Sequence, residues 1–533
     1  MRAALLAALL LAAPSRATAS EPVSKALVHH PVSTRSAQAQ ERFDEGLTLI
    51  YAFNREESQR RFRAAAAADP KLAIAWWGVA LAAGPNLNVG MTRDDWNTVR
   101  DALTRAQSLQ AEALPEERRL IAALAARYPA GATAPAGDAY REAMAAVYRD
   151  FPADADAATL YVESAMDSQA WGYGSDGKPL GDTEALAAIL STVLARAPAH
   201  PGANHYLIHI YDQTSVAARA LPSANALSAL PVEPAASHLR HMSGHIYFDL
   251  GMYAELQRDN REAVDDDRAY AAATRRDPAT LDYYFHNLDF YTGGSLMLGD
   301  ELETDRAIGF FRDASNPNAM LALDRSGRYA EALRAIPEPA AGARPYWLAR
   351  WRYARGIANV SLGHVDAAQA ELTALNALAP PAAGWQTRPI HALAALLGAR
   401  IAYARGNAPS AIEALRGVIA DSAAQPPESF AAWYYPIGEW LGWMLLESGD
   451  AAGAEKAFRA DLIRVPHNPR ALYGLMQALS AQDRTQQGDA YSGEIGRTWR
   501  GRFGDLSDPL RARPAQEQSR SEVRSRRVRI AAG

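Results

Sequence analysis

Residues 39–70 read AQERFDEGLTLIYAFNREESQRRFRAAAAADP, and this stretch decides the fold. It places the small residues Gly46 and Ser58 and the large residue Phe62 at spacings that suit two packed helices, and it ends at Pro70. Small residues let two helices approach closely, and a proline interrupts the chain before the next pair. The stretch therefore predicts a helical hairpin.

The same spacing recurs along the chain with a period of about 34 residues, which is the length of a tetratricopeptide repeat (TPR). Stretches that begin at Ala349 and Tyr435 again place a glycine, an alanine, a large apolar residue and a proline at equivalent positions. Apolar residues follow a helical period, and alternating valine-rich runs are absent. We therefore predict an all-α fold, a TPR-like α-solenoid of helical hairpins.

The N-terminus predicts export. The first twenty residues, MRAALLAALLLAAPSRATAS, combine a positive charge at Arg2, a short apolar core and an Ala-x-Ala cleavage site at Ala17–Ala19, which is typical of a secretory signal peptide. No later apolar run is long enough to span a membrane. We expect an exported, most simply periplasmic, protein.

Composition narrows the function classes. The chain of 533 residues has a formal net charge of −5 and no cysteine. This balance does not favour a nucleic-acid partner, and the lack of cysteine excludes disulfides and thiolate metal sites. We divide the chain into a signal peptide (1–19), a flexible N-terminal segment (20–38), a TPR-like region with a histidine-rich groove (39–300), C-terminal TPR repeats (301–484) and an irregular, arginine-rich tail (485–533).

Seven of the twelve histidines lie between His200 and His286. In the repeat frame, most of them fall at positions that line the concave groove of TPR domains, on helices whose axes lie about 8–10 Å apart. Imidazoles from neighbouring helices can then meet around one or two metal ions. The predicted metal ligands are His205, His209, His238, His241, His245, His286 and Asp289.

Glu163 and Asp167 fall at groove positions of an upstream repeat. There, a carboxylate could act as a general base for a metal-activated water, so these two are the predicted catalytic residues.

Five stretches between Phe43 and Leu298 resemble a family of bacterial, often exported TPR proteins with an HxxxH / HMxxHIY / HN histidine motif set. The stretches are LIYAFNREESQRRFRAAAAADP, AWWGVALAAGPNLN, PGANHYLIHIYD, HMSGHIYFDLGMYAE and YYFHNLDF. The resemblance implies the fold and the place of the site, because members carry histidines at the positions of His205, His209, His241, His245 and His286. It implies no particular reaction.

This chain departs from the family at two positions. Arg55 and Asp289 stand where relatives have histidines. Asp289 can still bind a metal, whereas Arg55 cannot.

Three functions remain open. The first is a metalloenzyme that uses a divalent transition metal (Cu, Fe or Zn), as an oxidoreductase or a hydrolase. The second is a non-catalytic TPR scaffold that binds a peptide, a protein or a small molecule in its concave groove. The third is a protein for metal storage or delivery.

Overall fold

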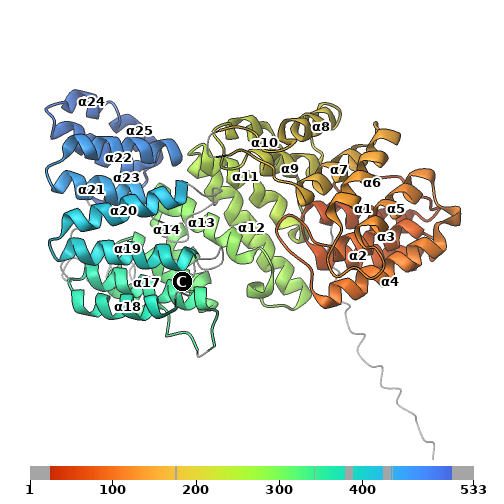
Figure 1. Cartoon of the computed structure of the whole chain (residues 1–533), viewed down its shortest axis with the longest axis horizontal. Coiled ribbons are helices and arrows are strands. Elements are labelled where there is room, and N and C mark those ends of the chain that lie inside the picture. The colour runs from red at the N-terminus through yellow and green to blue at the C-terminus, as the bar shows by residue number, and fades with distance from the viewer. Residues whose placement is uncertain are drawn as a thin grey trace, which may run out of the picture.

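The computed structural model describes residues 25–174, 177–340, 342–378, 388–423 and 436–506, together with residues 434 and 510. Within these ranges the chain is helical, and the one β-bridge joins Tyr173 to Pro179. Successive helices pack as antiparallel hairpins along the chain (Figure 1). The predicted all-α, TPR-like solenoid is confirmed.

The N-terminal half of the solenoid carries all seven clustered histidines. Its α-helices are α1 (Ala37–Tyr51), α2 (Arg55–Ala68), α3 (Ala73–Ala83), α4 (Arg93–Leu109), α5 (Pro115–Arg127), α6 (Gly137–Asp150), α7 (Ala155–Ser168), α8 (Thr183–Arg196), α9 (Pro201–Tyr211), α10 (Leu221–Ala229), α11 (Ser237–Asp249), α12 (Tyr253–Thr274) and α13 (Tyr284–Leu298).

The C-terminal half continues the hairpins, and short 3-10 helices join some of the elements. Its α-helices are α14 (Glu301–Asp313), α15 (Asn318–Arg325), α16 (Tyr329–Ala335), α17 (Pro345–Ser361), α18 (Val365–Leu378), α19 (Arg388–Ala404), α20 (Ala408–Ala423), α21 (Ile437–Glu447), α22 (Ala451–Arg464), α23 (Pro469–Ser480), α24 (Thr485–Asp489) and α25 (Ser492–Thr498). The 3-10 helices are η1 (Gln110–Glu112), η2 (Ala217–Ala220), η3 (Pro234–Ala236), η4 (Pro278–Thr280) and η5 (Phe503–Leu506).

Glycines at the repeat positions let the paired helices pack closely. A Cβ atom on Gly46 of α1 would lie 2.8 Å from the ring of Phe62, and one on Gly442 of α21 would lie 2.5 Å from the ring of Phe458. Both rings are fully buried. The glycine thus leaves the space that the aromatic ring of the following helix fills.

Helices of the N-terminal repeats that lie far apart in the sequence also pack against each other. Helix α1 packs against α2, as the repeat predicts, and in addition against α9, which follows it by about 150 residues. One hydrophobic cluster runs from Val32 to Leu298, and a second runs from Val264 to Leu510. The clustered histidines therefore lie inside the N-terminal part of the molecule.

Residues 25–36 differ from the flexible segment that we expected over 20–38. His30 is 5% exposed, and its Nδ1 atom lies 3.1 Å from Asp156 Oδ2. The Ser33 amide donates to Glu117 Oε1 at 2.6 Å. These buried polar contacts fix the segment against α5 and α7.

The start of the tail also differs from the irregular structure that we expected from residue 485 onward. Helices α24 and α25 lie there, and Ile495, Trp499 and Leu506 are buried with Leu472 of α23. These apolar residues form a small core, which the arginine-rich composition of the tail did not predict. The predicted signal peptide (1–19) and most of the remaining tail lie outside the described residues.

None of the described helices is both long enough and apolar enough to cross a membrane.

We expect Gly78→Ala to destabilise the fold. A Cβ atom on Gly78 would lie 2.4 Å from the ring of Phe62. Such overpacking costs about 1–3 kcal/mol, which exceeds the gain of about 1 kcal/mol in helix propensity. Gly309→Ala is the matched control, because nothing lies within 4 Å of its added Cβ atom. Thermal unfolding should show a lower melting temperature for Gly78→Ala only; equal effects of the two changes would contradict the packing argument.

Candidate metal centre

Six of the predicted ligands come together from three helices. His205 and His209 lie on α9, His238, His241 and His245 on α11, and His286 on α13. The i,i+4 spacing places His205 Nε2 3.1 Å from His209 Nε2, and His241 Nε2 3.0 Å from His245 Nε2. The repeat register therefore placed these imidazoles on adjacent helices.

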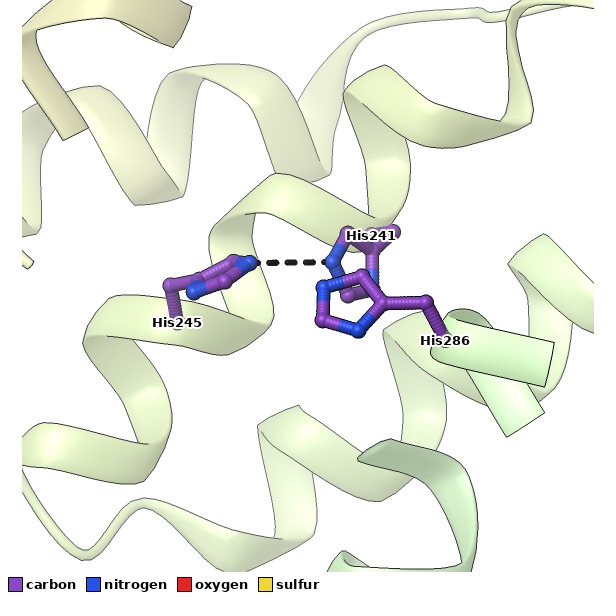
Figure 2. A group of neighbouring side chains, drawn as sticks. All are labelled: His241, His245 and His286. Atoms are coloured by element: carbon purple, nitrogen blue, oxygen red, sulfur yellow. Dashed lines mark hydrogen bonds between the residues drawn. The ribbon is translucent and has the colours of Figure 1, made fainter. Parts of the chain in front are cut away.

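The tightest group is His241, His245 and His286, whose candidate ligand nitrogens lie within 4.8 Å of one another (Figure 2). The ring centre of His286 lies 4.5 Å from that of His241 and 5.6 Å from that of His245. We call these three residues the histidine trio. His205, His209 and His238 do not form a second set within the same distance.

Hydrogen bonds fix which nitrogen of His241 and of His245 faces inward. Asp212 Oδ2 lies 3.0 Å from His245 Nδ1, and Asn260 Oδ1 lies 2.6 Å from His241 Nδ1. The Asn260 amide nitrogen donates to the Leu256 carbonyl at 3.0 Å, so its oxygen faces His241. Both Nδ1 atoms therefore carry a proton and donate it.

The Nε2 atoms of these two rings lie in contact with each other. If both rings are neutral with the proton on Nδ1, the Nε2 atoms of His241 and His245 are both acceptors, yet they lie 3.0 Å apart. A cation must relieve this contact: either a proton that converts one ring to imidazolium, or a metal ion. Burial and the neighbouring His286 and His245 hold the pKa of His241 well below its usual range, so a proton in this contact would have to lie on His245, whose Nδ1 atom faces Asp212.

The surroundings are apolar. The Phe290 ring lies 4.8, 4.6 and 5.0 Å from the rings of the histidine trio. The Phe53 ring contacts the other three histidines at 4.5–6.1 Å. Burial lowers the pKa of His205 and of His286 to about 3, and it holds the pKa of His209 and of His238 well below the usual range. The folded protein therefore keeps these five imidazoles, His241 included, neutral, as metal binding requires.

Asp289 does not face the histidine trio. Its Oδ1 atom accepts from Asn318 Nδ2 at 2.5 Å and from the Tyr434 hydroxyl. Burial raises the pKa of this carboxyl.

The carboxylates of Glu163 and Asp167, which were predicted as catalytic, lie near the buried Arg127. Arg127 donates to Asp167, and burial together with the charge of Asp167 raises the pKa of Glu163 well above its usual range. Glu163 lines a cavity of about 20 Å³, which is room for about one water, together with Phe53. No hydrogen bond or ion pair joins either carboxylate to the described histidines.

The sequence did not predict the residues that orient the histidines. The Tyr51 carbonyl accepts from His205 Nδ1 at 2.6 Å, although 154 residues separate the two. Asn260 carries no motif, whereas Asp212, three residues after His209 in NHYLIHIYD, offered a weak signal.

His200, the seventh clustered histidine, has a structural role. Its Nδ1 atom accepts from the Ala203 amide at the start of α9, and its Nε2 atom lies 3.2 Å from Asp156 Oδ1.

Comparisons with known proteins do not identify a function. No protein-family model matches the chain, and no curated protein matches its sequence. Among solved structures, the human IFIT1 dimer with PPP-AAAA is 11% identical with a TM-score of 0.32, covering 83% of this chain and 86% of that one. The human IFIT1 dimer with m7Gppp-AAAA is 10% identical with a TM-score of 0.34, covering 87% and 91%. The APC/C hetero-tetramer Cut9-Hcn1 is 11% identical with a TM-score of 0.28, covering 75% and 82%. These low similarities say nothing about what this chain binds.

We expect the metal-free protein to lose stability as the pH falls from about 6.5 to about 3. The pKa of His286 is about 3 in the folded protein and about 6.5 when unfolded, so in this window only the unfolded state binds the proton. One such group changes the unfolding free energy by roughly 1.4 kcal/mol per pH unit. Urea unfolding of chelator-treated protein should therefore show a shallower pH dependence for His286→Leu than for wild type. The matched control is His364→Leu, which replaces an exposed histidine. If the unfolding free energy of His286→Leu depends on pH as steeply as that of wild type, His286 is already charged in the folded protein.

Proposed function

We propose that the histidine trio binds a transition-metal ion through Nε2 of His241 and His245 and one ring nitrogen of His286. The observation that carries the proposal is the 3.0 Å contact between two Nε2 atoms whose Nδ1 atoms are both committed as donors. With metal–nitrogen bonds of about 2.0–2.1 Å, one ion can bind both nitrogens at this separation, with a ligand–metal–ligand angle of about 95°. The contact that is unfavourable between two lone pairs becomes favourable with an ion between them.

Charge balance favours copper among the candidate metals. The donors of the trio are neutral, and the nearest anion in the hydrogen-bond network is Asp212, which accepts from His245. A buried site stabilises an ion best when nearby charges compensate it. One carboxylate compensates a monovalent ion fully, and copper alone among Cu, Fe and Zn is commonly monovalent. Imidazole donors suit copper as well.

We infer that the protein is an exported, copper-dependent oxidoreductase rather than a hydrolase. Hydrolysis by a metal-bound water uses a nearby general base. Of the two carboxylates predicted for that role, Asp167 pairs with Arg127, and burial raises the pKa of Glu163 well above its usual range. Three protein ligands also leave a coordination position for a substrate, which distinguishes a catalytic site from a closed one. Storage or delivery of copper is the second candidate, because it uses the same donors without needing a substrate.

A scaffold role remains compatible with the repeat fold, but the histidines do not support it. His205, His238, His241 and His245 are 0–5% exposed, so a peptide in an open groove would reach only the partly exposed His209 and His286. A partner would contact mostly other surfaces of the solenoid.

The first test is metal content. We expect His245→Ala and His286→Ala each to lose most of the bound copper, because each removes one of three donors. Protein produced in its native host should be analysed by elemental mass spectrometry, with His364→Ala as a control that keeps full occupancy. Zinc in place of copper would refute the oxidative proposal, and full metal content in both trio variants would refute the site.

The second test concerns Asp212. Residues that orient a metal-bound histidine typically contribute about 10–100-fold to metal affinity. We therefore expect Asp212→Ala to weaken copper binding by about that factor. Competition with a chromogenic copper chelator measures the affinity, and the exposed Asp366 supplies the matched control, Asp366→Ala. Equal affinities of the two variants would show that Asp212 does not set the donor character of His245.

A further inference from the structure

A second group of metal-binding side chains lies at the start of α7 and shares no residue with the histidine trio. It consists of His30, Asp154 and Asp156, and one ligand atom from each lies within 4.8 Å of the others. His30 is 5% exposed and Asp156 is 7% exposed, so two of the three are buried. We call these three residues the N-terminal cluster.

The protein holds one carboxylate oxygen of each aspartate and leaves the other to His30. Asp156 Oδ1 accepts from the Tyr51 hydroxyl at 2.6 Å. Asp154 Oδ1 accepts from the Ala157 amide at 2.6 Å. The two Oδ2 atoms lie near His30 Nδ1, at 3.1 Å for Asp156 and 3.5 Å for Asp154. Partners of this kind orient metal-binding carboxylates in proteins.

The spacing of these three atoms suits a metal ion. Tetrahedral coordination with bonds of about 2.0–2.1 Å places the ligand atoms about 3.3–3.4 Å apart. The separations of 3.1 and 3.5 Å from His30 Nδ1 lie on either side of that value. The hydrogen of a protonated Nδ1 can point at only one Oδ2 atom, whereas an ion between the three atoms contacts all of them.

The cluster attracts a cation. Burial lowers the pKa of His30, but the hydrogen bond and the charge of Asp156 outweigh it and raise the pKa to about 9. A proton on His30 is therefore the competitor of a metal ion, and it adds one positive charge against two aspartates.

Glu116 of α5 adds a third carboxylate beside the cluster. Its Oε1 atom is buried and has no hydrogen-bond partner among the described residues. Burial and the charge of Asp154 raise the pKa of Glu116 to about 7, which reflects the excess of negative charge. A divalent ion compensates two of these charges where a proton compensates one, and buried charges are stable only when compensated.

We propose that the N-terminal cluster binds a divalent metal ion of the zinc class through His30 Nδ1 and the Oδ2 atoms of Asp154 and Asp156. Imidazole and carboxylate donors suit zinc. The ion would fasten the N-terminal segment to α7, at the same carboxylate that holds Tyr51. Its role is structural, because it joins two segments that are far apart in the sequence. This site does not rest on the proposed function, since the two sets of ligands are separate.

The test uses the full-length, chelator-treated protein and zinc itself as the probe. Equilibrium dialysis against buffered free zinc counts the bound ions and gives their affinity. Hydrogen–deuterium exchange of residues 25–36 reports whether the ion fixes the segment. Asp154→Asn removes one ligand oxygen and its charge but keeps the Oδ1 atom that accepts from Ala157, and His30→Gln removes the imidazole. The matched control is His29→Gln, because the neighbouring His29 side chain is 68% exposed.

We expect wild type to bind one zinc ion that Asp154→Asn and His30→Gln lack. The affinity should fall at least about 100-fold in both, because even residues that only orient a metal ligand contribute about 10–100-fold. Zinc should slow exchange of residues 25–36 in wild type and His29→Gln but not in Asp154→Asn. A carboxylate that served only to cap α7 would leave both measurements unchanged in this variant.

The proposal is overturned if Asp154→Asn binds as much zinc as His29→Gln, or if zinc leaves the exchange of residues 25–36 unchanged in wild type. His245→Ala, which removes a ligand of the histidine trio, should keep this ion. If His245→Ala loses it instead, the ion belongs to the trio and the N-terminal cluster is an ion-pair network. Failure of either site therefore leaves the other one standing.

Discussion

Tyr51 is the residue on which the arrangement of the site depends. Its side chain is fully buried, its hydroxyl group donates to Asp156 at 2.6 Å, and its carbonyl accepts from His205. Its ring occupies the space beside Gly202, where an added Cβ atom would lie 2.3 Å from it. One residue at the end of α1 thus fixes both the position of α9 and the ring orientation of a histidine on it. The Asp156 carboxylate, which also contacts His30 and His200, connects the N-terminal segment to the same point.

This contact explains why the histidines are buried. In an open solenoid each repeat touches only its neighbours, and the groove positions face solvent. Here α1 packs on α9 across several repeats, so the N-terminal repeats enclose the positions that would otherwise line a groove. The repeat register predicts the face of each helix, but it holds no information on this closure, because the closure depends on contacts between residues far apart in the sequence.

The same distinction separates the site residues that were predictable from those that were not. His241 and His245 share one helical face through their spacing alone, and the repeat frame placed α9 and α11 side by side. Asp289 occupies an equivalent position, but Asn318 and Tyr434 pair with its carboxylate. Asp167 likewise pairs with Arg127. A carboxylate contacts whichever donor the tertiary structure brings closest, and the sequence pattern cannot rank donors from distant helices.

The burial that shapes the site also makes it costly without an ion. Imidazoles with strongly lowered pKa values lie among Phe53, Phe290 and one another, and when His241 and His245 are both neutral their Nε2 lone pairs face each other at 3.0 Å. The packing of α1, α9, α11 and α13 must offset this cost, which accounts for the dense aromatic and hydrogen-bonded shell around a small polar centre. An ion that binds only to the folded state would remove the repulsion and stabilise the fold at once. Metal affinity and the stability of the N-terminal repeats are therefore two measures of one interaction energy, since the atoms that would bind the ion are those that strain the protein without it.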